Sequence, residues 1–376
     1  MLKDVRRRRA IVLIDQRGTG ASNPLDCTLH DPDDLAGPME DPVPLAKIAA
    51  CAKGWRADTR RYRTVDAADD LEAVRTALGY GAINLWGASY GTRLALEYLR
   101  RHGGHARAVV LDGVAPAGMV LPLAAAKDGQ AALDRVLADA SADLPDLPDQ
   151  LRQLLDRPPT RVTLSHPRTG AQQTFAVDRD DISALVRGAL YAPELASVLP
   201  VAIVRALAGD FGPFAAISAA LSGGLEDNLS LGLMLAVICA EDAPRIAPGD
   251  IERAVQGTIF GASLVKPLVD ACALITTETA PIALDEPVVS DVPALILSGG
   301  SDPATPPRWG ERTAAALSRS THVQVPEMGH GLTIRGCVPD VIAEFLEAGA
   351  VEGLDTECAT KVRRPSFFVR MTGPTP

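Results

Sequence analysis

Short apolar runs alternate with amphipathic stretches at both ends of the chain. β-branched, apolar segments predict strands at Ala10 to Ile14, Ile83 to Trp86 and Ala108 to Leu111. Between the first two, residues 64–78 place apolar side chains on one helical face, with Thr64 as the expected N-cap. This alternation of strand and helix predicts a mostly parallel sheet with helices on its faces.

The pattern becomes mainly helical from about Pro116 to Pro287. It predicts helices at Leu123 to Leu137, Asp181 to Leu190 and Leu229 to Cys239, and one hairpin at Arg161 to Val177. Strand and helix signals then return at Pro293 to Ser298, His322 to Val325 and Pro339 to Leu346. We therefore expect an α/β core made of residues 1–116 and 288–376, interrupted by a mostly helical cap at 117–287. The basic tail after Cys358 is expected to be loosely ordered.

Composition and charge exclude several classes of protein. The 376 residues contain 37 Lys and Arg against 47 Asp and Glu, so the formal net charge is −10. That balance argues against a nucleic-acid partner, which requires a basic face. No apolar run approaches the length of a membrane span. Four arginines, Arg6 to Arg9, precede Ala10 to Ile14, but this apolar run is too short for an export signal.

The cysteines favour disulfides over a metal site. None stands in a CxxC pattern, and they fall into three couples that are local in sequence, which suits three disulfides in an oxidising compartment. The pairing stays open, and six buried free thiols are the alternative. The six are Cys27, Cys51, Cys239, Cys272, Cys337 and Cys358.

The strongest chemical motif is Gly87-Ala88-Ser89-Tyr90-Gly91. It follows a predicted strand and precedes a helical stretch, which is the context that a nucleophile elbow requires. The flanking glycines permit the tight turn that lifts the Ser89 hydroxyl above the sheet edge. The backbone N–H of Tyr90 can then donate to an oxyanion at a helix N-terminus.

A serine nucleophile needs a base that is held by a carboxylate, in the chain order serine, acid, histidine. Asp302 follows the strand at Pro293 to Ser298, and His330 lies between two glycines after the strand at His322 to Val325. The sequence therefore predicts a catalytic triad of Ser89, Asp302 and His330. This chemistry requires no metal and no organic cofactor.

Four segments together resemble the α/β-hydrolase serine exopeptidases, in the branch of proline iminopeptidase and the tripeptidyl aminopeptidases, including their characteristic C-terminal region. The resemblance implies a helical cap over the site and cleavage of peptides near a free N-terminus. It also implies that acidic cap residues hold the substrate's ammonium group; Glu241 is the candidate, with Asp242 behind it, and surface acids at a helix end are the alternative. The four segments are Asp15 to Ser22, Gly87 to Gly91, Gly300 to Pro306 and Gly329 to Gly331.

One departure from this family concerns the start of the chain. The family places an HGGPG-like loop before the segment equivalent to Asp15 to Gly20, and that loop supplies the second oxyanion N–H. By resemblance, Ala10 to Ile14 is the family's fourth strand, so its first three strands are absent here. We therefore expect a sequence truncated at its N-terminus, whose complete form is exported to the periplasm or outside the cell.

The expected function is that of a serine aminopeptidase of prolyl or tripeptidyl type. Two alternatives stay open: a carboxylesterase of small esters that uses the same triad, and an inactive or binding-only fragment that lacks half of its oxyanion hole. The expected partner is a peptide with a free N-terminus, and the sequence leaves the oligomeric state open.

Overall fold

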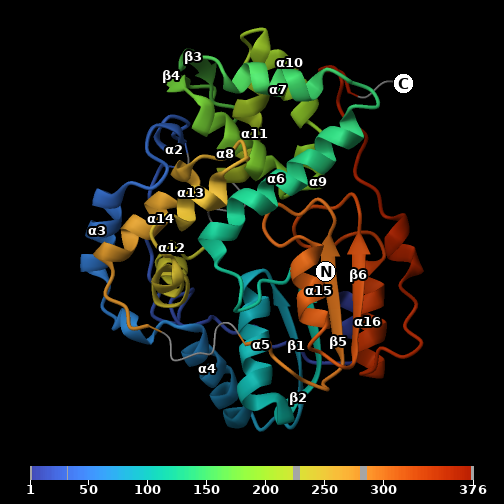
Figure 1. The fold of residues 1–376 in the computed structure, drawn as a ribbon. Coiled ribbons are helices and arrows are strands. Elements are labelled where there is room, and N and C mark those ends of the chain that lie inside the picture. Colours follow the sequence, from blue (N-terminus) through green and yellow to red (C-terminus); the bar gives the residue numbers. More distant parts are fainter. Residues whose placement is uncertain (1, 32, 223–228, 280–285, 374–376) are drawn as a thin grey trace.

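A parallel sheet forms the lower half of the molecule in Figure 1. The structure is a computed structural model that describes residues 2–31, 33–222, 229–279 and 286–373. Within these ranges the sheet has four strands in the order β1-β2-β5-β6, all parallel. The predicted parallel α/β architecture is confirmed. The strands are β1 (Ile83–Ala88), β2 (Ala106–Asp112), β5 (Ala294–Gly299) and β6 (Ser320–Val325).

Helices cover both faces of the sheet, and the two-residue period of each strand divides its side chains between them. In β2, Val109 and Leu111 pack with α4 (Thr64–Ala77) and α5 (Tyr90–His102). Ala108 and Val110 point the other way, into a core with α16 (Val338–Ala348) and Val5 of α1 (Lys3–Arg6). Because both faces are covered, the central strands are apolar throughout rather than alternating with polar residues.

The residues between β2 and β5 form a mainly helical layer above the sheet (Figure 1). It has its own apolar core, centred on Leu133, Phe175 and Ile203. The α-helices and strands of this layer are α6 (Leu121–Ala140), α7 (Leu147–Leu155), the hairpin β3 (Thr160–Ser165) and β4 (Gln172–Val177), α8 (Arg179–Leu190), α9 (Pro193–Ala196), α10 (Leu199–Leu207), α11 (Gly212–Ser222), α12 (Leu231–Val237), α13 (Asp250–Val255) and α14 (Lys266–Asp270).

Two further α-helices, α2 (Gly37–Glu40) and α3 (Leu45–Gly54), precede α4, and α15 (Pro307–Ala314) lies between β5 and β6. Short helical turns complete the described elements: η1 (Thr59–Arg61), η2 (Gly103–His105), η4 (Ile238–Asp242), η5 (Ala243–Arg245), η6 (Ala262–Leu264), η7 (Ala271–Leu274) and η8 (Glu357–Lys361).

The predicted buried strand at Ala10 to Ile14 is wrong. The segment has no secondary structure and pairs with no strand among the described residues. The exposed fractions of Ile11, Val12, Leu13 and Ile14 are 39%, 45%, 87% and 40%. The apolar pattern satisfies one requirement of a buried strand, but a strand also needs a neighbour to pair with its N–H and C=O groups. In the described part of the sheet, β1 pairs only with β2.

Two smaller expectations are also corrected. The N-cap of α4 is Arg63, whose backbone N–H donates to the Asp66 carboxylate, and Thr64 is the first helical residue. The tail is ordered over residues 359–373, because Phe367 is buried beneath the Arg364 guanidinium and Phe368 N–H donates to Ser197 O at 2.8 Å. The basic composition of the tail gives no indication of these contacts.

The cysteines form three disulfides, which confirms that prediction and resolves the pairing. The bonds are Cys27–Cys51, Cys239–Cys272 and Cys337–Cys358, at sequence separations of 24, 33 and 21 residues. Loops of this length correspond to about 3–4 kcal/mol of stabilisation each in the chain-entropy description. The second bond joins the turn that carries Glu241 to η7, and the third joins the start of α16 to the tail.

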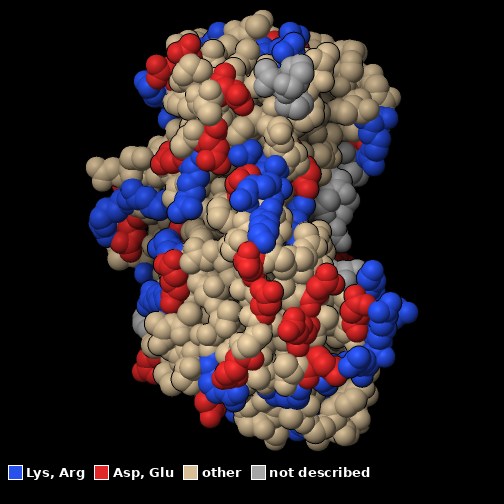
Figure 2. Space-filling view, turned by 90° about the vertical axis from the view of Figure 1, so that its right-hand side faces the viewer, with Lys and Arg blue, Asp and Glu red and all other residues tan. Residues whose placement is uncertain are grey.

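The surface mixes both signs of charge. Figure 2 shows acidic and basic side chains interspersed on the face that it presents. The net charge of −10 is therefore not concentrated there as a single acidic field. No helix within the described ranges is long and apolar enough to cross a membrane.

Candidate active site

Ser89 occupies a strained turn between β1 and α5. Its φ of 53° and ψ of −123° lie in a region that non-glycine residues rarely adopt. Such a conformation costs about 1–3 kcal/mol and persists only where the surroundings hold it. Two hydrogen bonds do so: Ser89 N–H donates to Asp112 O at 2.9 Å, and the Thr92 hydroxyl donates to Ser89 O at 2.5 Å. A Cβ at Gly87 would lie 2.3 Å from Gly91 O, so this turn requires glycine before the serine.

Asp302 and His330 form a hydrogen-bonded pair above the sheet. His330 Nδ1 lies 2.8 Å from Asp302 Oδ2, and the carboxylate is fully buried. The other oxygen, Oδ1, accepts the backbone N–H groups of Ala304 and Thr305, both at 2.8 Å. These bonds fix the carboxylate in the turn that follows β5, so that it orients the imidazole through Nδ1. The other ring nitrogen, Nε2, is then available to act as a base.

Asp302 and His330 shift each other's pKa values in opposite directions. Burial alone would raise the pKa of Asp302, but the His330 charge and hydrogen bond outweigh it, so the pKa lies below its ordinary value. Burial alone would lower the pKa of His330, but Asp302 outweighs that effect and raises the pKa. The arrangement therefore stabilises an imidazolium beside a carboxylate.

Gly113 brings the imidazole close to the serine turn. It directly follows β2, and a Cβ there would lie 3.0 Å from His330 Cε1. Its neighbour Asp112 pairs in register with Ala88 and accepts the Ser89 N–H. The carboxyl ends of the parallel strands β1, β2, β5 and β6 thus bring the three predicted triad residues to one edge of the sheet. A hydroxyl, an imidazole and a carboxylate in this arrangement can support nucleophilic acyl transfer.

Three residues that position His330, directly or through the loop that follows it, were not predicted from the sequence. The buried carboxylate of Asp112 accepts the N–H groups of Leu332 and Thr333 at 2.8 Å and the Thr333 hydroxyl at 2.6 Å, which holds the loop after the histidine. Asp112 ends a predicted strand, and sites in parallel α/β sheets lie at the carboxyl ends of strands, so its position is the sequence signal for this role.

The other two residues are Thr305 and Tyr191, and both contact His330 directly. The Thr305 hydroxyl donates to Asp302 Oδ2 at 2.8 Å and lies 3.1 Å from His330 Nδ1. Tyr191 lies just after α8, and its carbonyl accepts the backbone N–H of His330 at 2.9 Å. The Tyr191 ring meets the His330 imidazole edge-on, with 5.4 Å between the ring centres. The helical layer therefore contacts the histidine directly, and no local sequence signal marks this contact.

Tyr90 begins α5, where backbone N–H groups have no partner within the helix. Its hydroxyl lies 3.0 Å from Thr64 Oγ1 and 3.4 Å from Gln16 Nε2. Burial is the main cause that raises the pKa of Tyr90 to about 12, so the phenol stays neutral. The side chain thus points toward the start of α4, and the N–H is the group available to an oxyanion.

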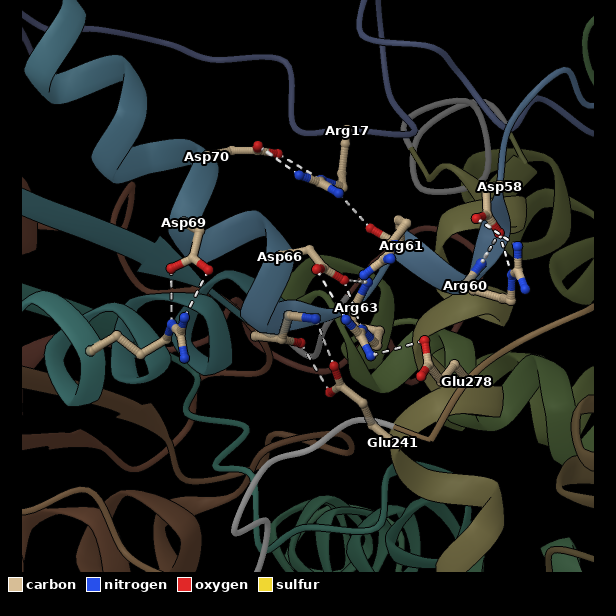
Figure 3. Close-up of polar contacts among 12 residues, drawn as sticks. Arg17, Asp58, Arg60, Arg61, Arg63, Asp66, Asp69, Asp70, Glu241 and Glu278 are labelled. Carbon is tan, nitrogen blue, oxygen red and sulfur yellow. Dashed lines mark hydrogen bonds and ion pairs between the residues drawn. The ribbon is translucent and has the colours of Figure 1, made fainter.

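Glu241 and Asp242 lie in the π-turn Ile238–Asp242, and neither side chain is exposed, which excludes the surface-acid alternative. Figure 3 shows Glu241 facing the start of α4. Its oxygens accept the Thr64 N–H at 2.7 Å and the Thr64 hydroxyl at 2.9 Å. The buried Arg93 guanidinium of α5 lies 3.4 Å from Glu241 and 3.2 Å from Asp242. Burial raises the pKa of both carboxyls, and Arg93 opposes that shift.

The Asp15 to Gly20 segment supports this cluster from the surface side. Arg17 donates two hydrogen bonds of 2.6 Å to the Asp70 carboxylate of α4 and one to Arg61 O (Figure 3). Gln16 reaches the Tyr90 hydroxyl from the same loop. Asp15 accepts the Ala21 N–H and closes the turn. No group of three or more His, Cys, Asp or Glu side chains within the described ranges is arranged to hold a metal ion.

Comparison with known proteins gives a family and several partial relatives. The family model for the alpha/beta hydrolase fold matches residues 1–335. Tripeptidyl aminopeptidase of Streptomyces lividans is 34% identical over 116 residues, which is 27% of this chain and 21% of that protein. The putative hydrolase YuaR of Escherichia coli K12 is 34% identical over 106 residues, which is 28% of this chain and 21% of that protein. The matched segments thus span about a fifth of these curated relatives.

Among solved structures, proline iminopeptidase of Mycobacterium smegmatis is similar over 78% of this chain and 74% of its own, at 17% identity and a TM-score of 0.34. The family match covers most of the chain and includes the serine turn, the aspartate and the histidine. The chain therefore belongs to the alpha/beta hydrolase fold family.

Proposed function

We propose that this α/β hydrolase is a serine peptidase that cleaves peptides from the N-terminus. The proposal rests on the strained Ser89 turn and on an imidazole paired with a buried carboxylate, both at the carboxyl end of the parallel strands. The partial similarity to tripeptidyl aminopeptidase supports a peptide substrate. The three disulfides support export of the protein.

In the proposed reaction, Ser89 Oγ attacks the scissile carbonyl carbon while its proton moves to His330 Nε2. The Tyr90 N–H donates to the resulting oxyanion. The C–N bond breaks as His330 passes the proton to the leaving amine, and water, activated by His330, then hydrolyses the acyl-enzyme. Asp302 keeps the Nδ1–H tautomer and stabilises the imidazolium in both steps.

The pH dependence of turnover follows from the same pair. His330 must be neutral to accept the Ser89 proton, and Asp302 raises the pKa of the imidazole. We expect kcat/KM to fall as pH decreases through an apparent pKa above the usual histidine value of about 6.5. Asp302→Asn, measured over the same pH range, should move that limb to lower pH and reduce kcat. An acidic limb that is unmoved in this variant would contradict the assignment.

We propose Glu241, with Asp242 behind it, as the anchor of the substrate's ammonium group. Glu241 and Asp242 share the Arg93 guanidinium, and Arg245 lies 3.7 Å from Asp242. Thr64 links Glu241 to the Tyr90 hydroxyl, one residue beyond the nucleophile. An ammonium group at this position would replace contacts that Thr64 and Arg93 make with Glu241 in the structure.

N-acetylation of a peptide substrate tests this anchor. Loss of one charged hydrogen bond, worth about 1.5–3 kcal/mol, should lower kcat/KM about 10- to 150-fold. The acetylated and free peptides are compared under identical conditions, with a small ester that lacks an amine as the control for intact catalysis. Equal rates for the two peptides, with efficient ester cleavage, would favour a carboxylesterase instead.

A further inference from the structure

Arg187 places a positive charge beside the histidine from the helical layer. It lies on α8, one helical turn before Tyr191, and its guanidinium carbon is 5.3 Å from the centre of the Tyr191 ring. That ring in turn meets the imidazole of His330 edge-on. Arg187 Nη2 also reaches the carbonyl of Pro303, the residue after Asp302, at 3.5 Å. The side chain thus spans the junction between α8 and the loop that carries the acid.

The guanidinium of Arg187 has few hydrogen-bond partners in this position. Its Nε is buried and has no hydrogen-bond partner, and the bond to Pro303 is at the long limit. No carboxylate pairs with Arg187 within the described ranges. Two other arginines near the same junction are paired, Arg308 with Asp128 at 2.6 Å and Arg335 with Glu194. A half-buried cation without a counter-ion is costly, and it becomes favourable when an anion binds.

The same charge acts on the imidazole. Asp302 raises the pKa of His330 above its ordinary value, and the Arg187 charge opposes part of that rise without reversing it. Catalysis requires an imidazolium when the serine proton is transferred, so an uncompensated neighbouring cation disfavours that step. An anionic group that neutralised the Arg187 charge would remove this unfavourable effect on the His330 imidazolium. Binding of such a group would therefore favour both substrate affinity and proton transfer.

We propose that Arg187 binds a carboxylate on the leaving-group side of the substrate and thereby selects short peptides with a negative charge close to the scissile bond. The leaving-group side follows from His330, which delivers its proton to the leaving amine. A guanidinium presents a planar fork that matches a carboxylate with two parallel hydrogen bonds. The inference rests on the proposed peptidase function and adds a substrate class to it.

The test compares three peptides that share one sequence on the acyl side. The first ends in a free carboxylate just beyond the scissile bond, the second in an amide, and the third in an amide with an aspartate side chain in the leaving group. We expect wild-type kcat/KM for at least one carboxylate peptide to exceed that of the plain amide about 10- to 100-fold. The first and third peptides distinguish a terminal carboxylate from a side-chain carboxylate.

Arg187→Gln should bring that ratio close to 1, because it removes the charge and retains polarity. Arg187→Lys should keep only part of the preference, since an ammonium cannot form the two-pronged contact. Arg205→Gln is the matched control: it removes an arginine of the same layer that is ion-paired with Asp210, and the ratio should stay at the wild-type value.

Two results would overturn the inference: a wild-type ratio near 1, or a ratio that Arg187→Gln leaves unchanged. In both cases the amide peptide is still cleaved, and the proposed peptidase function stands. Failure of that function has a different signature, in which the wild-type protein cleaves none of the three peptides.

Discussion

Ser89→Ala should lower turnover of aminoacyl and tripeptidyl anilides about 10⁴- to 10⁶-fold, the range seen when a triad nucleophile is removed. The substitution deletes one hydroxyl at a turn held by hydrogen bonds of the Ser89 backbone to Asp112 and Thr92, which do not involve the Ser89 side chain. Alanine keeps the Cβ, so the positive φ is retained at similar cost. The measurement is kcat with an anilide substrate, together with circular dichroism and thermal unfolding to show that the fold is intact.

Ser165→Ala provides the control for this experiment. Ser165 is exposed at the end of β3 in the hairpin, where its hydroxyl accepts a hydrogen bond from Gln172. A fluorophosphonate probe should label the wild type and Ser165→Ala on Ser89, and it should not label Ser89→Ala. Unchanged turnover in Ser89→Ala would refute the nucleophile. Folded wild-type protein that resists the probe would instead favour the binding-only alternative.

Local sequence signals were sufficient to predict the strained turn at Ser89 and to propose Asp302 and His330 as its partners. The glycines around Ser89, and the positions of Asp302 and His330 after apolar runs, depend on neighbours a few residues away. Because parallel strands align their carboxyl ends, separate runs converge on one edge of the sheet. The α/β-hydrolase fold could therefore be predicted from spacing and from the resemblance together.

The contacts that support the site depend on tertiary packing, and their partners are distant in sequence. Asp112 binds Leu332 across 220 residues, and Thr64 binds Glu241 across 177. Tyr191 reaches His330 only because the helical layer packs against the core at that point. Hydrophobic periodicity carries no information on such pairs. The segment 10–14 shows the converse, since a strand-like pattern without a pairing neighbour stays outside the sheet.

The buried ion cluster beneath the serine turn should be the site of the largest change in stability. Arg93→Met removes the guanidinium that Glu241 and Asp242 share, and all three side chains are buried, with exposed fractions of 2%, 0% and 0%. Breaking a buried ion pair from one side costs about 3–5 kcal/mol, because the remaining charge is left uncompensated. We expect the free energy of unfolding, measured by urea titration at pH 8, to fall by about that amount.

The same variant should respond to pH in a defined direction. Burial raises the pKa of Glu241 and Asp242 in the folded wild type, and removal of Arg93 deletes the main opposing charge. A carboxyl with a raised pKa in the folded state favours folding below its unfolded pKa, and that contribution is lost as pH rises through the folded pKa. The defect of Arg93→Met should therefore be smaller at pH 5 than at pH 8.

Arg101→Met is the matched control, because Arg101 lies on the same helix and pairs with Asp69 at 2.7 Å on the surface. An exposed pair contributes about 0–1 kcal/mol, so this variant should lose little stability. Adding Glu241→Gln and Asp242→Asn to Arg93→Met should recover part of the loss, since neither amide carries a charge that needs Arg93. If Arg93→Met behaves like Arg101→Met, or its defect is the same at both pH values, the two carboxylates do not depend on Arg93 for their charge, and the electrostatic account of this cluster is wrong.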